Sequence, residues 1–419
     1  MSKVITRTHI LDDAIHAAAC GSPRSTTTTL FRESKKRRFD NDSLDLIKES
    51  EAKRVNNSIN KKWAQHALLF SSFTDGVQYN KEALQYLRQG VTRKMSEEFT
   101  RYLEKIVKQS AVVSPCVGPT NLDALAMLEQ CDALIEDYDR LEFCQHRQDI
   151  VDQLMELMIS ASGDHEDSFN RCVKLLYIPT AMYALRKDST NTPGKQRQRA
   201  RVDAKQRRDL IVATLDSVFD GSDILAVSLD LDDGSVKQPT STLMGGAVTD
   251  NEKLRTFPRE GKEALVSWSP HIVYVEGGNT FWLSHCMNLG DWGHYIRSAC
   301  TNGYNGASAV YCGKSAGAIV GGSFVETATW KGWDDPSVVP GMEKPEDWKG
   351  IKGMSLLGDT NISFFPHMSP TWKNLVDERR STIQGKAFTL EENQVVLVDG
   401  KRQRYNVCCQ SASQLADKA

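Results

Sequence analysis

The sequence predicts an α/β protein in which a mostly parallel sheet, covered by helices on both sides, follows an α-helical amino-terminal region. After residue 150, short apolar runs bounded by turn residues alternate with helical stretches such as 208–219, which is typical of parallel strands buried on both faces. Before residue 150, apolar residues recur at steps of three and four instead. These patterns predict three segments: a disordered basic arm at 1–42, a helical domain of unknown role at 43–150 and an α/β domain at 151–419.

The composition is that of a soluble globular protein, with 419 residues, 40% of them hydrophobic, and a net charge of -2. This balance gives no overall attraction for nucleic acid, so we do not expect a nucleic-acid partner. The ten cysteines include no C-x-x-C pair, which argues against a zinc ribbon or a thioredoxin-type site and favours reduced thiols inside a cell. The amino terminus lacks the apolar core of a secretory signal, and no apolar run reaches the ~20 residues of a membrane helix. We therefore expect a cytoplasmic protein without a membrane partner.

Two basic stretches leave alternatives open. Lys35–Arg38 in the predicted arm is either part of a solvated tail or a nuclear import signal. The stretch 186–208 is either a solvated loop leading into a charged helix face or a patch for an anionic partner. For the second stretch we expect the solvated helix face.

The region before residue 150 contains one clear amphipathic helix. A single apolar stripe is formed by Leu84, Leu87, Val91, Met95, Phe99, Leu103 and Ile106. A second helical pattern follows the start signal Pro119-Thr120. Nothing here gathers catalytic residue types, so we expect 43–150 to pack against the rest of the chain or to recruit a protein partner.

Six apolar runs predict the strands of the α/β domain: VKLLYIP, ILAVSLDL, HIVYVEGG, AVYCG, NISFFP and QVVLVDG. A seventh run, LMELMISAS, is ambiguous, because the preceding helix could continue through it. In parallel sheets the reactive residues gather at the carboxyl ends of the strands. The polar segments EGGNT, GKSAG and PHM all follow predicted strands, so they are the candidates for a site.

The segment Gly313-Lys314-Ser315-Ala316-Gly317 fits the G-x-S-x-G nucleophile elbow. A sharp strand-to-helix turn needs small flanking residues, and it presents the serine hydroxyl at a helix N-terminus, where free N–H groups favour negative charge. The alternative is an ordinary tight turn. The run AVYC before the motif and the helical pattern after it favour the elbow.

A nucleophilic serine needs a base, and a histidine base needs an acid that orients it. One histidine, His367, follows the elbow, at the end of a predicted strand, where a structural role is the alternative. Glu391 and Glu392 precede the last predicted strand and are the candidate acids, although such residues are commonly solvated. The order serine, histidine, acid differs from that of the α/β-hydrolases, so another fold must hold this set.

Four motifs in this order, VEGGNTFWL, YCGKSAGA, FFPHM and LEENQVVLVDG, resemble the peptidase E and cyanophycinase family of serine peptidases over about residues 155–405. The resemblance implies a glutamine-amidotransferase-like three-layer sandwich for the catalytic domain at 151–419. It makes Ser315 the nucleophile, His367 the general base and Glu392 the acid, with Glu391 as the alternative. The family pattern also implies an oxyanion hole from the N–H groups of Gly278 and Ala316, a loop shaped by Asn279 and Thr280, and no metal or cofactor.

Departures from the family pattern leave the substrate open. Glu276 replaces the first residue of the family's Gly-Gly-Gly-Asn loop, and Lys314 stands beside the nucleophile. Asp334 in GWDDP matches a family turn after an insertion, and Arg379 and Arg380 are candidates for holding an acidic substrate side chain. We predict a serine peptidase for short peptides, with aspartyl dipeptides among the candidate substrates. The alternatives are a cyanophycinase-type hydrolase of β-aspartyl-arginine substrates and a catalytically silent binding or regulatory module.

Overall fold

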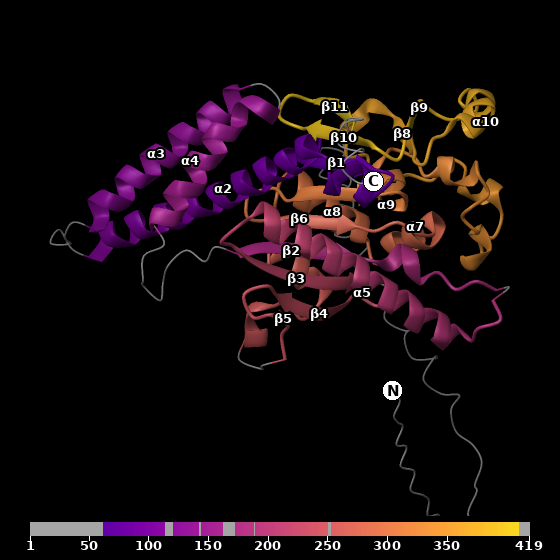
Figure 1. Cartoon of the computed structure of the whole chain (residues 1–419), viewed down its shortest axis with the longest axis horizontal. Helices are drawn as coiled ribbons and strands as arrows, with labels where there is room; N and C mark the ends of the chain where they lie inside the picture. Colours follow the sequence, from indigo (N-terminus) through magenta and orange to yellow (C-terminus); the bar gives the residue numbers. More distant parts are fainter. Residues whose placement is uncertain are drawn as a thin grey trace, which may run out of the picture. The chain divides into compact units, whose positions relative to one another are not determined.

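The computed structural model describes residues 62–113, 120–141, 144–161, 172–187, 189–249 and 253–409, and a nine-stranded sheet lies at its centre (Figure 1). The strand order is β11-β10-β1-β7-β6-β2-β3-β4-β5. The five strands β1, β7, β6, β2 and β3 are parallel to their neighbours within this group. Antiparallel strands extend the sheet on both sides. On one side β10 pairs with β1 and β11 pairs with β10, and on the other side β4 pairs with β3 and β5 pairs with β4. The predicted arm at 1–42, including Lys35–Arg38, lies outside the described residues.

The elements have the following bounds. The strands are β1 (His66–Phe70), β2 (Cys172–Ile178), β3 (Asp223–Asp230), β4 (Ser235–Ser241), β5 (Gly246–Ala247), β6 (Ile272–Val275), β7 (Val310–Lys314), β8 (Ile362–Phe365), β9 (Lys386–Thr389), β10 (Gln394–Asp399) and β11 (Arg404–Cys409). The α-helices are α2 (Lys81–Val113), α3 (Thr120–Arg140), α4 (Gln148–Ala161), α5 (Pro193–Val218), α6 (Gly261–Val266), α7 (Thr280–Leu289), α8 (Trp292–Thr301), α9 (Ala316–Gly321) and α10 (Lys373–Arg379).

Helices cover both faces of the sheet, and the alternation of side chains along the strands shows it. On β1, Leu68 and Phe70 belong to a buried apolar cluster with α2, α4 and α5, whereas Ala67 and Leu69 belong to a second cluster with α6 to α9. Successive side chains of a strand point to opposite faces, so the sheet lies between two helical layers. The predicted three-layer α/β sandwich is confirmed.

The amino-terminal helices form part of this sandwich. The predicted apolar stripe lies on α2, where Leu87, Val91 and Met95 are buried against the sheet. Helices α3 and α4 contact α2 and each other, and Figure 1 shows them beside α2. Within the described residues no helix is both long and apolar enough to cross a bilayer.

Two details differ from the sequence expectation, and one run that the sequence leaves open is assigned. Residues 66–70 form strand β1 between β10 and β7, so the expected helical segment 43–150 contributes a strand to the middle of the sheet and is not separate from it. The run LMELMISAS, which the sequence leaves open between strand and helix, has its residues 154–161 in helix α4. The run NISFFP forms β8, which pairs with β9 in a separate two-stranded sheet.

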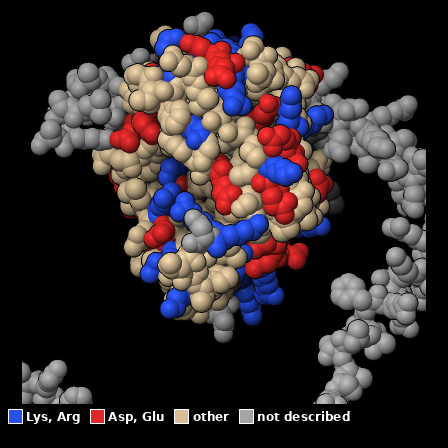
Figure 2. Space-filling view, turned by 90° about the vertical axis from the view of Figure 1, so that its right-hand side faces the viewer, with Lys and Arg blue, Asp and Glu red and all other residues tan. Residues whose placement is uncertain are grey.

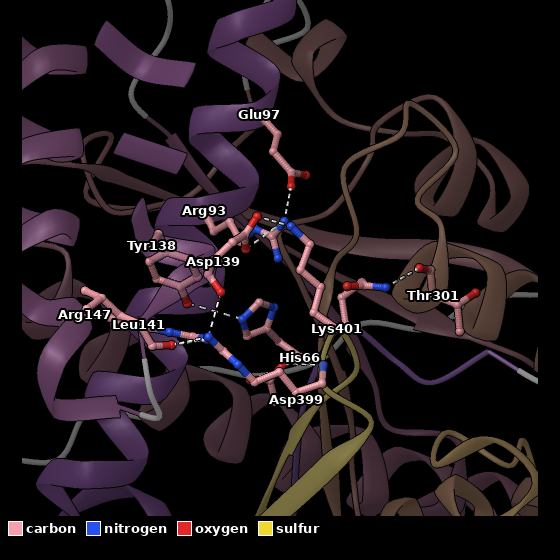
Figure 3. Close-up of polar contacts among 12 residues, drawn as sticks. His66, Arg93, Glu97, Tyr138, Asp139, Leu141, Arg147, Thr301, Asp399 and Lys401 are labelled. Atoms are coloured by element: carbon pink, nitrogen blue, oxygen red, sulfur yellow. Dashed lines mark hydrogen bonds and ion pairs between the residues drawn. The ribbon is translucent and has the colours of Figure 1, made fainter. Parts of the chain in front are cut away.

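A buried polar cluster joins the amino-terminal helices to the sheet (Figure 3). His66 opens β1 and lies 3.3 Å from the hydroxyl of Tyr138 on α3. Arg147 pairs with Asp399 of β10 at 3.3 Å and lies over the Tyr138 ring. Arg93 of α2 contacts Asp139 at 3.5 Å. Burial, together with Arg93, lowers the pKa of His66 to about 3, so this imidazole is neutral in the folded protein at pH 7.

The basic stretch 186–208 matches the solvated-helix expectation in part. Helix α5 begins after its N-cap Thr192, and Arg197 pairs with Asp232 at 2.8 Å. Arg208 is buried and donates to the Gln238 carbonyl oxygen at 2.7 Å. On the face that carries α7 and α10, Figure 2 shows basic and acidic side chains interspersed rather than one continuous basic surface.

Candidate active site

Ser315 occupies a strained turn between β7 and α9. Its backbone has φ +48° and ψ -105°, which non-glycine residues rarely adopt. Its N–H donates to the carbonyl oxygen of Phe70 at the end of β1 (2.8 Å), and its own carbonyl accepts from Ile319 in α9 (3.0 Å). The turn is therefore fixed by the sheet on one side and by the helix on the other.

The two glycines of the motif are required by close backbone contacts. A Cβ on Gly313 would lie 2.7 Å from the Gly317 carbonyl oxygen, and a Cβ on Gly317 would lie 2.3 Å from the Val275 carbonyl oxygen. Larger residues at either position would push the strand and the helix apart. The sequence motif therefore marks a true strand-turn-helix elbow, as the steric reading of G-x-S-x-G requires.

His367 contacts the serine from the loop after β8. Its Nε2 lies 2.8 Å from Ser315 Oγ. The residue has φ +56°, and its N–H donates to the hydroxyl of Ser71 at 2.8 Å, which in turn donates to the Leu390 carbonyl oxygen at 3.0 Å. The residues at the end of β1, Phe70 and Ser71, thus hold the backbones of both the serine and the histidine.

The acid that contacts the histidine is Glu392. Its Oε1 lies 2.6 Å from His367 Nδ1. Glu391 instead donates its backbone N–H to the side chain of Gln394 at 3.0 Å. With Nδ1–H donating to Glu392, His367 Nε2 is free to accept the Ser315 hydroxyl proton. The three side chains selected from the sequence therefore form one chain of two short hydrogen bonds.

The loop after β6 brings one free N–H group to the serine. A Cβ built on Gly277 would lie 3.0 Å from Ser315 Cβ, so the loop passes directly beside the hydroxyl. The N–H of Gly277 donates to Glu276 Oε1 (2.9 Å), that of Asn279 to the Ala181 carbonyl oxygen (2.8 Å) and that of Thr280 to Asp334 Oδ2 (2.9 Å). The N–H of Gly278 contacts no acceptor among the described residues.

Two further features fit these residues for binding an oxyanion. Gly278 has φ +148°, and a Cβ there would lie 2.4 Å from the Ala181 carbonyl oxygen, so this position requires glycine. Ala316 is the first residue of α9, where an N–H has no acceptor within the helix. The N–H groups of Gly278 and Ala316 are thus donors without an acceptor among the described residues, in the two segments that flank the serine.

The two departures noted in the sequence, Glu276 and Lys314, contact each other. The Glu276 carboxylate is 1% exposed, and its Oε1 lies 2.8 Å from Lys314 Nζ and 3.1 Å from Arg207 Nη1. Tyr177 donates its hydroxyl to Oε2 at 3.0 Å. Burial and the Glu276 charge raise the pKa of Tyr177 far above its usual value, so the phenol remains a donor. One carboxylate therefore ties β7, which precedes the serine, to the loop 276–280 after β6.

The loop 331–335 contacts both the segment of His367 and the loop 276–280 after β6. Lys331 Nζ donates to the carbonyl oxygens of Pro366 (2.6 Å) and His367 (2.8 Å). Burial lowers the pKa of Lys331 to about 8, against the attraction of Glu392. At the other end, Asp334 accepts from Thr280, and the Asp335 carbonyl oxygen accepts from Asn279 Nδ2 at 2.9 Å.

The remaining candidates are placed as follows. Asn279 caps α7 by accepting from Trp282 N at 2.8 Å, and burial raises the pKa of Asp334. Asn279, Thr280 and Asp334 therefore hold loops together around the site. Arg379 and Arg380 lie exposed at the end of α10, and no contact joins them to Ser315, His367 or Glu392 among the described residues.

Sequence reasoning missed Ser71, Lys331 and Trp333. Ser71 had a detectable signal, since the run HALLF before it has the length and composition of a buried strand. Lys331 and Trp333 lie in a segment of short turns without periodicity, and only their contacts reveal them. The described residues contain no group of three or more potential metal ligands.

Comparison with known proteins agrees with the motifs. Residues 248–405 match the model of peptidase family S51. The resemblance to the peptidase E family is confirmed. No curated protein matches the chain. Among solved structures, a protein of Listeria monocytogenes EGD-e assigned to peptidase E aligns at 14% identity and a TM-score of 0.33, covering 61% of this chain and 93% of that one. The family match supports a peptidase, and β1 to β5 and α2 to α5 lie outside the matched segment.

Proposed function

We propose that the protein is a serine peptidase that hydrolyses short peptides through Ser315, His367 and Glu392 and an acyl-enzyme. The observation that carries this proposal is the pair of contacts at His367, 2.8 Å to the serine hydroxyl and 2.6 Å to the glutamate. A base within hydrogen-bond reach of a nucleophile, and itself oriented by an acid, is the arrangement that nucleophilic catalysis needs.

In this mechanism Ser315 Oγ attacks the scissile carbonyl carbon while His367 Nε2 takes the hydroxyl proton. Glu392 accepts the hydrogen bond from Nδ1 and stabilises the imidazolium. The carbonyl oxygen becomes an oxyanion that accepts from the N–H groups of Gly278 and Ala316. Collapse of the tetrahedral intermediate breaks the C–N bond, and His367 returns its proton to the leaving amine. A water molecule then attacks the ester carbonyl with His367 again as base, which releases the acid and restores Ser315.

The proposed substrate class is carried over from the resemblance to the peptidase E and cyanophycinase family. Aspartyl dipeptides are the first candidates, and β-aspartyl-arginine is the second. Arg379 and Arg380 are exposed at the end of α10 and contact none of Ser315, His367 and Glu392, so the proposal assigns them no role in recognising an acidic side chain.

The test is a mass-spectrometric screen of the purified full chain against Asp-X, Glu-X and β-Asp-Arg dipeptides. We expect cleavage that falls by at least about a thousandfold in Ser315→Ala, since loss of the nucleophile removes the acyl-enzyme route. Ser369→Ala is the matched control, because its hydroxyl contacts Thr371 instead of the site. Cleavage that survives Ser315→Ala, or no cleavage of any peptide by the wild type, contradicts the proposal.

A further inference from the structure

The loop 331–335 carries an exposed tryptophan beside the catalytic histidine. Trp333 is 57% exposed, and its ring centroid lies 5.8 Å from that of His367. Most large aromatic side chains of this protein are buried, so an exposed one next to the site needs a reason.

The loop holds Trp333 in place from both sides. Lys331, two residues earlier, donates to the His367 carbonyl oxygen, and Asp334, the next residue, accepts from the N–H of Thr280 at the start of α7. The indole ring also contacts Trp372 edge-on, with centroids 5.5 Å apart, and Lys331 Nζ lies 4.3 Å from its centroid. These contacts fix the ring before any substrate arrives, so little side-chain entropy is left to lose on binding.

The chemistry of the site assigns a substrate group to this position. After the serine attacks, His367 must hand its proton to the leaving nitrogen, so that nitrogen lies within hydrogen-bond reach of Nε2. The residue that carries the leaving nitrogen therefore lies on the imidazole's side of Ser315. Trp333 is an exposed aromatic side chain next to this imidazole, with the two ring centroids 5.8 Å apart.

The charges around Trp333 favour an apolar partner over an acidic one. Lys331 is the cation at this position, and its ammonium already donates to two backbone carbonyl oxygens and lies over aromatic rings. Glu392 and Asp334 are the acids that act on it. The Lys331 charge is therefore already balanced by these carboxylates and by its two carbonyl partners, which leaves an acidic side chain no free cation here. An apolar side chain would instead remove the exposed indole surface from water.

We propose that Trp333 forms the wall of the subsite for the leaving-group residue and selects peptides whose carboxyl-terminal residue is apolar or aromatic. This inference rests on the proposed function, since it assigns a substrate side chain to the site of Ser315. It names the side of the scissile bond, a feature that neither the motifs nor the family match supplies.

The experiment measures kcat/KM of the full-length protein for Asp-Phe, Asp-Leu, Asp-Ala, Asp-Lys and Asp-Glu, with the same five residues after Glu and after β-Asp. We expect Phe and Leu to be preferred over Ala by about tenfold, a typical discrimination for an apolar contact. In Trp333→Ala this preference, taken as the ratio of kcat/KM for the Phe and Ala peptides, should fall toward unity. Trp333→Phe should keep most of it. Tyr405→Ala is the control, because it removes a half-exposed aromatic ring from edge strand β11.

The outcomes separate the two proposals. If no peptide is cleaved in a way that depends on Ser315, the proposed function is contradicted, and the subsite is contradicted with it. Cleavage with equal rates for Phe and Ala, a preference for Glu, or a Phe preference that persists in Trp333→Ala overturns the subsite and leaves the peptidase intact. A preference lost in Trp333→Ala, kept in Trp333→Phe and unchanged in Tyr405→Ala supports it.

Discussion

The Glu276 carboxylate offers the most quantitative test of how this site is held together. Glu276→Gln preserves the size of the side chain and an acceptor for the Gly277 N–H, but it removes the counter-charge of Lys314 and Arg207. Breaking a buried ion pair from one side costs about 3–5 kcal/mol. The side chain of Arg207 is 47% exposed and can be hydrated again, so its share is small, whereas that of Lys314 is only 19% exposed. We therefore expect a loss of about 2–3 kcal/mol in the free energy of unfolding.

The assay is urea denaturation of the wild type, Glu276→Gln, Lys314→Met and the double variant, with linear extrapolation to water. Removing Lys314 alone leaves Glu276 with Arg207, Tyr177 and the Gly277 N–H, so its cost should be lower, about 1 kcal/mol. The loss of unfolding free energy in the double variant should be smaller than the sum of the two single losses by at least about 1 kcal/mol, because the two charges are removed together. Effects that add within about 0.5 kcal/mol would refute the idea that the two residues act as a pair.

Three further predictions concern Gly278, Lys331 and His66. Gly278→Ala should lower kcat by about a hundredfold or more, because its Cβ would strike the Ala181 carbonyl oxygen and displace an oxyanion donor. Gly246→Ala is the control, because Gly246 also has a strongly positive φ (+123°) but open space at its Cβ, and it should leave kcat unchanged; equal effects would contradict the assignment. The pKa of Lys331 is about 8, so kcat/KM should fall as the pH rises through 8, because the ammonium then loses the charge that holds the His367 carbonyl oxygen. The pH–rate profile of Lys331→Arg should lack this decline. The same decline in both proteins would rule out Lys331 as its cause. His66 has a folded pKa of about 3, below its unfolded value, so the stability it contributes is complete above about pH 6.5 and is lost as the pH falls toward 3. Between pH 6 and 4.5 this group should make the free energy of unfolding fall by about 1.4 kcal/mol for each unit of decreasing pH. The same pH dependence in His66→Gln would show that another group causes it.

The sequence predicts those parts of the fold whose signal is local. The runs at β2, β3, β6, β7 and β10 are continuous and bounded by turns, and each forms a strand as expected. Strand β1 was missed because it is short, stands among helical patterns and gains its place from pairing with residues 310–314 and 395–399. The hydrophobic periodicity of one segment does not reveal pairing with strands that are distant in the sequence.

The candidate site shows the same division. Ser315 follows β7 and Glu392 precedes β10. Because β10 runs antiparallel to β1 and β7 runs parallel to it, the start of β10 and the end of β7 lie at the same edge of the sheet. That edge could be predicted once the strands were known. The pairing of Glu276 with Lys314 needed the register of β6 against β7, in which Val275 stands opposite Gly313. The position of Trp333 depends on the hydrogen bonds of Lys331 and Asp334, which no spacing in the sequence indicates.

The central claim is that Ser315 is a nucleophile activated by His367. Covalent labelling with a fluorophosphonate probe, mapped by mass spectrometry, tests it directly and needs no knowledge of the substrate. We expect a single adduct on Ser315 in the wild type, none in Ser315→Ala and a labelling rate reduced by about a thousandfold in His367→Ala. A wild-type protein that the probe leaves unmodified at Ser315, or labelling of Ser315 at the same rate without the imidazole, would contradict the account.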